Sequence, residues 1–180
     1  MENAIIDIPV ELLNPAETAH YEGEVNLPVM KFGPDLYTFE QALTWDVEVT
    51  NTGEALLVEG TCDVVGTTAC ARCGEAAEVP LFGEIEGYFL LDAESASEED
   101  LEDDEFDVLP DDRKLDLLPL IQSAITLDIP VIPLCDDDCK GLCTQCGANL
   151  NEGPCDCAQE DDGINPNNPF AALKDFKIEE

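Results

Sequence analysis

The chain has 180 residues, and its 42 Asp and Glu against 7 Lys and Arg give a formal net charge of −35 at pH 7. This charge argues against strong direct binding to DNA or RNA, which depends on Lys and Arg side chains that neutralise phosphates. No stretch reaches the roughly 18–20 apolar residues of a membrane span, and the first residues resemble no secretory signal. With 44% hydrophobic residues, the composition favours one folded domain with a core of its own.

Residues 1–91 are expected to form mainly antiparallel β-structure. A short strand is expected within residues 4–10, where Pro9 places it at the edge of a sheet. From residue 43 to residue 50 apolar side chains alternate with polar ones, a period of two that is typical of a half-buried strand. Similar alternation covers residues 56–64 and 77–91, and the connections are too short for parallel crossovers. This part of the chain therefore predicts an antiparallel meander.

Residues 92–112 form an acidic stretch that contains twelve carboxylates in twenty-one residues. Like charges at this density repel one another, and there is little apolar surface to bury, so we expect a mobile linker. The stretch is either a solvated loop or a docking strip for a basic partner.

One main helix is expected within residues 113–157. Asp116 suits its N-cap, and Pro119 is tolerated only in the first turn. A stripe at helical spacing would face the core: Leu117, Leu118, Ile121, Ala124 and Ile125. The helix should end at Ile129–Pro130, ahead of a short extended piece at residues 131–134.

A second, short helix is expected in the tail, residues 158–180, with Asn168 as its cap and Pro169 as its first residue. Together these elements predict an α+β fold: an antiparallel β-meander with one main helix, a cysteine-rich metal-binding segment and a short C-terminal helix. Residues 113–157 would pack on the β part, residues 1–91, as one domain.

Nine cysteines, an odd number at short spacings, favour a reduced metal-binding set over a disulfide framework. Cys62 lies on the apolar face of a predicted strand, where a buried free thiol is common. The other eight lie in turns rich in Gly, Asp and Pro and fall into four pairs: Cys70/Cys73, Cys135/Cys139, Cys143/Cys146 and Cys155/Cys157. Two of these pairs form C-x2-C-G knuckles, in which two thiolates grip one metal and the glycine permits a tight return.

Eight thiolates could fill one or two closed tetrahedral Zn²⁺ sites, which are structural because no coordination position stays open. The preferred grouping consists of two sites, Cys70/Cys73 with Cys135/Cys139 and Cys143/Cys146 with Cys155/Cys157. A rival grouping joins the two knuckles, Cys70/Cys73 with Cys143/Cys146. The spacing alone leaves both open.

One enzymatic alternative uses the block Cys139, Cys143 and Cys146. Its C-x3-C-x2-C spacing is that of the [4Fe–4S] cluster in radical S-adenosylmethionine enzymes, but those enzymes need a large α/β barrel that this strand-rich chain does not predict. His20 is the only histidine and has no nucleophile nearby in the sequence. We therefore expect no catalytic residues, and we expect Arg72 to support the geometry of the thiolates.

Four motifs along the chain resemble one known family. They are CARC at residues 70–73, LDIPVIPLC at 127–135, CKGLCTQCGANLN at 139–151 and NPFAAL at 168–173. The chain is similar to the YceD family, the bacterial large ribosomal RNA subunit accumulation proteins. In that family the knuckle usually reads C-P-x-C-G. Thr144 replaces the proline here, which slightly loosens the turn and removes no ligand.

The resemblance implies a cytoplasmic bacterial protein that supports the synthesis or accumulation of large-subunit (23S) ribosomal RNA. Together with the charge, it predicts a non-enzymatic ribosome-biogenesis factor. This factor would dock basic ribosomal or rRNA-processing proteins through an acidic surface on a zinc-stabilised scaffold. No membrane, small-molecule or direct nucleic-acid partner is expected. The alternatives are an Fe–S or redox enzyme, and a zinc-stabilised acidic adaptor unrelated to ribosomes.

Overall fold

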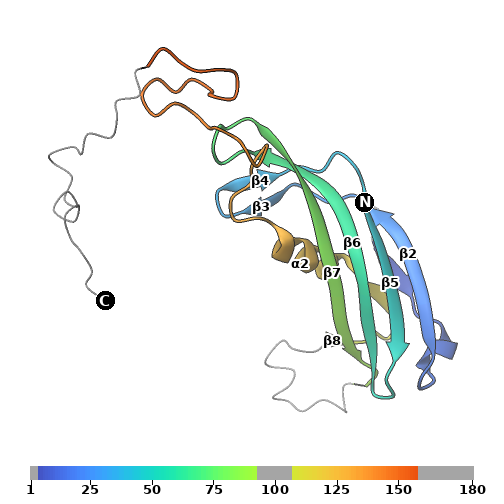
Figure 1. Cartoon of the computed structure of the whole chain (residues 1–180). Helices are drawn as coiled ribbons and strands as arrows, with labels where there is room; N and C mark the ends of the chain where they lie inside the picture. Colours follow the sequence, from blue (N-terminus) through green and yellow to red (C-terminus); the bar gives the residue numbers. More distant parts are fainter. Residues whose placement is uncertain (1–3, 93–106, 158–180) are drawn as a thin grey trace, which may run out of the picture. The chain divides into compact units, whose positions relative to one another are not determined.

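The structure is a computed structural model of the chain, and it describes residues 4–92 and 107–157. The chain divides into two compact units, Met1–Cys139 and Lys140–Glu180. The larger unit contains the helices and strands, whereas the described part of the smaller unit consists of turns and loops (Figure 1). The four-part division expected from the sequence stays a prediction.

A five-stranded sheet forms the body of the larger unit, in the order β2-β5-β6-β7-β8. Its strands are β2 (Thr18–Val25), β5 (Leu43–Asn51), β6 (Ala55–Ala69), β7 (Ala76–Leu90) and β8 (Asp107–Val108). Neighbouring strands are antiparallel, except that β8 runs parallel to β7. The predicted meander over β5, β6 and β7 is confirmed. β6 is longer than the alternation over residues 56–64 indicated, whereas β7 lies within one residue of the predicted range 77–91.

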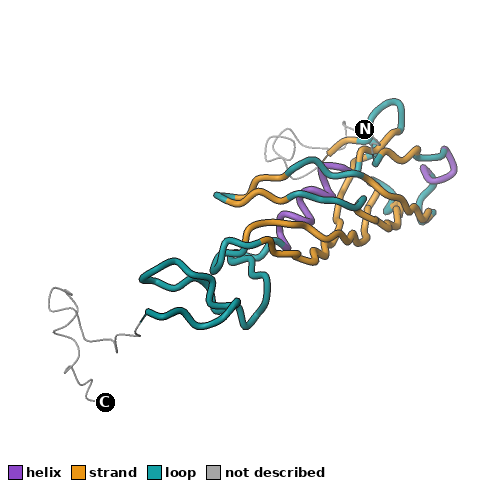
Figure 2. The backbone as a smooth tube through the Cα atoms, turned by 90° about the horizontal axis from the view of Figure 1, so that it is seen from above, coloured by secondary structure: helices purple, strands orange, loops and turns teal. Residues whose placement is uncertain are grey.

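One face of this sheet is buried and carries the core. The helix α2 (Leu118–Asp128) covers it and packs mainly on β7 (Figure 2). At Gly83 of β7 an added Cβ would lie 2.8 Å from the Cβ of Ala124 and 2.8 Å from the sulfur of Cys62. The helix can approach the sheet this closely because Gly83 has no side chain. Cys62 is 1% exposed on the same face, as expected for a core thiol.

The helix starts at Leu118, and its N-cap residue is Leu117, one position after the predicted cap. The carboxylate of Asp116 still accepts a hydrogen bond from the Leu118 N–H at 3.0 Å, which satisfies one of the free donors of the first turn. Pro119 lies in that turn, and the helix ends before Ile129. Leu118 is only partly buried, whereas the rest of the predicted stripe is buried: Leu117, Ile121, Ala124 and Ile125.

Two small antiparallel sheets complete the larger unit: β1 (Ile5–Asp7) with β9 (Lys114–Asp116), and β3 (Met30–Phe32) with β4 (Asp35–Tyr37). The 3-10 helix η1 (Val10–Leu13) follows Pro9. The sequence patterns predicted β1 but none of β2, β3, β4, β8 and β9. Residues 131–134, expected to be extended, form no strand.

The exposed edge of β7 is protected by a carboxylate and a proline. Within the described residues, β8 pairs only with Phe89 and Leu90 at one end of this edge. Further along, Asp128 Oδ2 accepts a hydrogen bond from the Phe82 N–H at 2.7 Å. Pro80, two residues before Phe82, has no N–H to donate. This stretch of the edge therefore offers few donors to a strand of another molecule.

Two expectations concern residues outside the described ranges: the mobile linker, for residues 93–106, and the C-terminal helix at Asn168. The end of the acidic stretch, by contrast, is described. Asp107 and Val108 form β8, and the Leu109 N–H donates to the Leu90 carbonyl at 2.8 Å. The helix in the described part of the chain is too short to span a membrane.

Candidate metal centres

The two C-x2-C-G knuckles have the same backbone geometry. The Gly74 N–H donates to the Cys70 carbonyl at 2.8 Å, and the Gly147 N–H donates to the Cys143 carbonyl at 2.9 Å. Both glycines have a positive φ, 77° and 75° respectively, which residues with a side chain rarely adopt. Thr144, at the position where the family usually has proline, leaves this turn intact.

The first knuckle lies at the tip of the β6–β7 hairpin, as the sequence predicted. Its partners, Cys135 and Cys139, come from the segment that follows α2. A backbone hydrogen bond of 2.8 Å from the Ala71 N–H to the Pro133 carbonyl joins the two segments. The proline-rich segment before Cys135 thus lies along the hairpin tip and brings the second pair of thiols to the first.

The sulfurs of Cys70, Cys73, Cys135 and Cys139 all lie within 4.8 Å of one another. The sulfur of Cys70 is 3.8 Å from that of Cys139, and the sulfur of Cys73 is 3.6 Å from that of Cys135. Four Zn–S bonds of about 2.3 Å in a tetrahedron separate the sulfurs by about 3.8 Å. This first cluster therefore has the dimensions of a zinc site with four thiolate ligands. Three of its residues are buried, and Cys135 is exposed.

The second cluster lies in the smaller unit, and its sulfurs are also within 4.8 Å of one another: Cys143, Cys146, Cys155 and Cys157. None of these residues is buried. Within residues 140–157 Gly141 alone is buried, and Leu142 is 45% exposed. The segment thus has no apolar core of its own, so a stable fold depends on its thiols and on what they bind.

The eight thiols are grouped as in the preferred pairing, and the rival that joins the two knuckles does not occur. The same grouping separates the C-x3-C-x2-C block, because the sulfur of Cys139 belongs to the first cluster and those of Cys143 and Cys146 belong to the second. This arrangement does not favour a three-cysteine Fe–S site. His20 forms an ion pair with Asp46, with 2.6 Å between Nε2 and Oδ2, and both side chains are exposed.

The pKa values within each cluster are uneven. Burial raises the pKa of Cys70, but backbone N–H groups, that of Cys135 first, outweigh it and bring the pKa to about 6. Hydrogen bonds from backbone N–H groups, that of Cys146 first, lower the pKa of Cys143 to about 6. Hydrogen bonding with Cys139 raises the pKa of Cys135. Four neighbouring thiols cannot all ionise unaided, whereas a bound cation deprotonates them together.

The Arg72 side chain ties the two halves of the first cluster together. Its Nη1 donates to the carbonyl of Asp137 at 3.1 Å and to that of Cys139 at 2.9 Å. Arg72 therefore connects the knuckle to the loop that carries the second pair of thiols. This contact agrees with the structural role expected for Arg72, since groups of this kind orient ligands without touching the metal.

The family model of the large ribosomal RNA subunit accumulation protein YceD matches residues 58–177, which is 120 of the 180 residues. The matched span contains both clusters. The chain belongs to the YceD family.

This YceD-family chain is similar to a protein from a plant and to one from a bacterium. The chloroplastic large ribosomal RNA subunit accumulation protein YCED homolog 1 of Arabidopsis thaliana is 31% identical over 148 residues, which cover 67% of this chain and 46% of that protein. An uncharacterized protein of Mycobacterium tuberculosis is 33% identical over 126 residues, which cover 69% of this chain and 60% of that protein. The chain thus spans about half the length of these relatives. No solved structure matches it.

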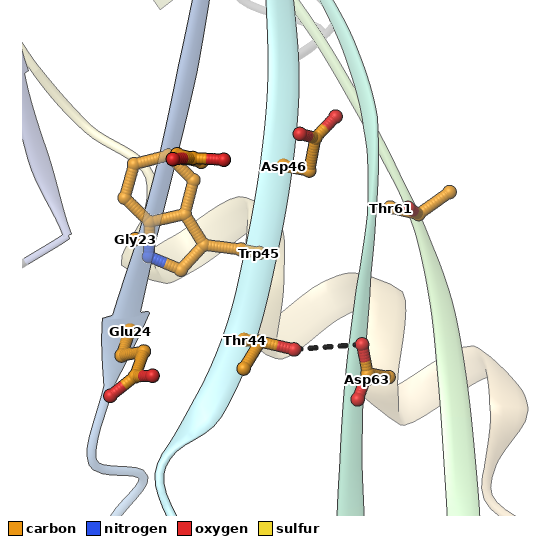
Figure 3. A pocket seen from close by; sticks show the side chains of 8 residues that line it. Gly23, Glu24, Thr44, Trp45, Asp46, Thr61 and Asp63 are labelled. Carbon is orange, nitrogen blue, oxygen red and sulfur yellow. Dashed lines mark hydrogen bonds between the residues drawn. The ribbon is translucent and has the colours of Figure 1, made fainter.

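A second feature, which the sequence patterns did not predict, lies on the outer face of the sheet of this YceD-family protein. A hollow of about 420 Å³ extends over β2, β5 and β6, and four carboxylates border it: Glu22, Glu24, Asp46 and Asp63 (Figure 3). The Thr44 hydroxyl donates to Asp63 at 2.7 Å. The acidic residues are visible in the sequence at the polar positions of the strands, but which of them become neighbours depends on the register between strands.

Proposed function

We propose that this YceD-family protein supports the synthesis or accumulation of large-subunit (23S) ribosomal RNA in the bacterial cytoplasm, without catalysing a reaction. Membership of a family named for accumulation of this RNA carries the proposal. The two clusters of four cysteines support it, because four thiolates around one metal leave no open position for a substrate. They suit a scaffold better than an active site.

The mode of action we propose is protein–protein docking. A net charge of −35 disfavours a grip on RNA phosphates and favours a basic partner, either a ribosomal protein or an rRNA-processing protein. Charge complementarity over an exposed surface steers encounter and is screened by salt, with a Debye length of about 8 Å at 0.15 M. The complex should therefore weaken sharply between about 0.05 and 0.5 M salt.

The metal we propose is zinc, one ion in each cluster. The thiolate-only ligand sets and the sulfur spacing of the first cluster support this choice. Elemental analysis of protein purified without added metal should give two zinc ions per chain. Replacing Cys70 and Cys73 by serine, or Cys143 and Cys146 by serine, should remove one ion each. Iron in an anaerobic preparation would instead favour the Fe–S enzyme.

The deciding experiment is depletion of the protein in its host, followed by quantification of 23S against 16S ribosomal RNA. We expect 23S RNA and large subunits to fall, while 16S RNA is retained. Re-expression of the wild-type chain should restore the ratio. An unchanged ratio would contradict the proposal and favour an adaptor unrelated to ribosomes.

A further inference from the structure

Carboxylates lie side by side on the outer face of the sheet, in rows that run across the strands. The register places Glu48 of β5 opposite Glu59 of β6, and Glu59 opposite Glu86 of β7. We call the outward carboxylates of β2, β5, β6 and β7 the acidic face: Glu22, Glu24, Asp46, Glu48, Glu59, Asp63, Glu78, Glu84 and Glu86. All nine residues are exposed, and no other element in the described part of the chain covers them.

The acidic face has almost no counter-charge. None of the seven Lys and Arg residues occupies an outward position of these four strands. In the described residues the only ion pair on this face joins His20 to Asp46. An approaching cation would thus meet carboxylates that have few internal partners.

This arrangement works against the stability of the sheet. Like charges directly opposite one another on neighbouring strands are destabilising. The row Glu48–Glu59–Glu86 contains two such contacts in succession. Threonine at position 59 would suit the strand better, and lysine there would pair with the two flanking carboxylates. A row of charges that destabilises its own sheet suggests that these residues serve to bind another molecule.

A second and independent observation concerns apolar side chains on the same face. Phe82 of β7 is 66% exposed and Val65 of β6 is 43% exposed, although both lie within long strands. They line a hollow of about 300 Å³ together with Asp63 and Pro80. An exposed aromatic ring beside carboxylates suits an arginine, which can stack on the ring and pair with the acid.

We propose that the acidic face docks an extended segment of a partner protein that is rich in Arg and Lys. This inference rests on the proposed function and assigns its docking surface. Alternate side chains of an extended chain are roughly 6.6–6.8 Å apart, the same spacing as carboxylates two residues apart on one strand. Such pairs occur on three strands of the face: Glu22/Glu24, Asp46/Glu48 and Glu84/Glu86. A peptide along the strands therefore matches the charges in spacing as well as in sign.

The test compares two triple variants that lose the same charge. One neutralises the row (E48Q, E59Q and E86Q), and the other neutralises exposed acids away from the face (E11Q, E17Q and E54Q). The probe is a fluorescein-labelled peptide of alternating arginine and threonine, titrated by anisotropy against the zinc-loaded full chain at 0.15 M salt. The row variant should raise the Kd about tenfold and the control variant less than twofold.

The melting temperature of the row variant and a comparison of arginine with lysine peptides give two further readouts. The row variant should melt at the same or a higher temperature than wild type, so a loss of binding cannot come from unfolding. F82T should weaken the arginine peptide more than a lysine peptide of the same pattern. Equal losses in the row and control variants would overturn the proposal. Tighter binding of a single-stranded RNA of 20 nucleotides than of the peptide would overturn it too.

The failure of this inference differs from the failure of the proposed function. In depleted cells the row variant should fail to restore 23S RNA, whereas the control variant should restore it. Full rescue by the row variant would refute the docking face and leave the proposed function intact. An unchanged 23S level after depletion would refute the proposed function, while the peptide titration would still report on the face.

Discussion

Replacing Cys135 by serine tests whether the first cluster holds the larger unit together through a metal. Cys135 is the exposed member of that cluster, so the substitution removes a ligand without opening a cavity in the core. Its sulfur and that of Cys73 are 3.6 Å apart but 62 residues apart in the chain. A metal that joins them closes a loop of that length. C135S should open this loop by releasing the metal, because a metal that stayed would still join Cys139 to Cys70 and Cys73.

The expected loss of stability in C135S follows from the conformational entropy of the unfolded chain. A cross-link across 62 residues restricts the unfolded state by about 4 kcal/mol, on the same scale as a disulfide. With a urea m-value of about 2 kcal/mol/M, the unfolding midpoint should fall by about 2 M. Trp45 is the only tryptophan and lies 8% exposed in the core of this unit, so its fluorescence reports the transition.

A matched control comes from the second cluster. C143S removes one thiol from the smaller unit, and the Trp45 transition should stay at its wild-type midpoint, because that cluster closes only a local loop. Excess chelator added to the wild-type chain should reproduce the C135S curve. The reasoning would be refuted if C135S lost one zinc ion and still unfolded at the wild-type urea concentration.

Three further predictions concern Arg72, which lies beside the first cluster, and two residues on the core face of the sheet, Gly83 and Cys62. R72A, which loses hydrogen bonds to two carbonyls of the cluster loop, should weaken zinc binding there about tenfold. This is measured by competition with a chromophoric chelator in the C143S background. G83A should lower the free energy of unfolding by about 1–3 kcal/mol in urea titrations, because its Cβ would meet Ala124. Burial raises the pKa of Cys62 from 9.0 to about 11. The thiol therefore adds stability that is fully present below pH 9 and is lost as the pH rises towards 11. The C62A variant should lose less stability over that pH interval, and equal losses would contradict this assignment.

The meander could be predicted because its strands bury alternate residues. Along β5 every second side chain from Leu43 to Val49 is buried, and the sequence alternates accordingly. In β2 the inward positions include Ala19, Tyr21 and Gly23, which are only half-buried, so no clear apolar alternation appears. Gly23 is explained only by its neighbour, since an added Cβ there would lie 2.5 Å from the indole of Trp45 (Figure 3). That neighbour comes from another strand and cannot be read from local sequence.

The grouping of the cysteines also depends on contacts that local sequence does not reveal. Each knuckle is a local turn, and its glycine at a positive φ follows from the C-x2-C-G pattern. Which pairs share a metal depends on where α2 delivers Cys135 and Cys139, so the spacing alone left two groupings open. The rows of the acidic face depend on register in the same way, because Glu48, Glu59 and Glu86 become neighbours only through pairing across three strands.

The lack of an apolar core in residues 140–157 couples this segment to the supply of metal. When zinc fills the second cluster, the free energy of folding of the segment is essentially the free energy of zinc binding. Each tenfold fall in free zinc then removes about 1.4 kcal/mol from it. The larger unit has its own hydrophobic core, so loss of metal from the first cluster should lower its stability without unfolding it. In a zinc-starved cell, molecules with an intact sheet and an unfolded cysteine segment would accumulate, so zinc availability would set how many copies are complete.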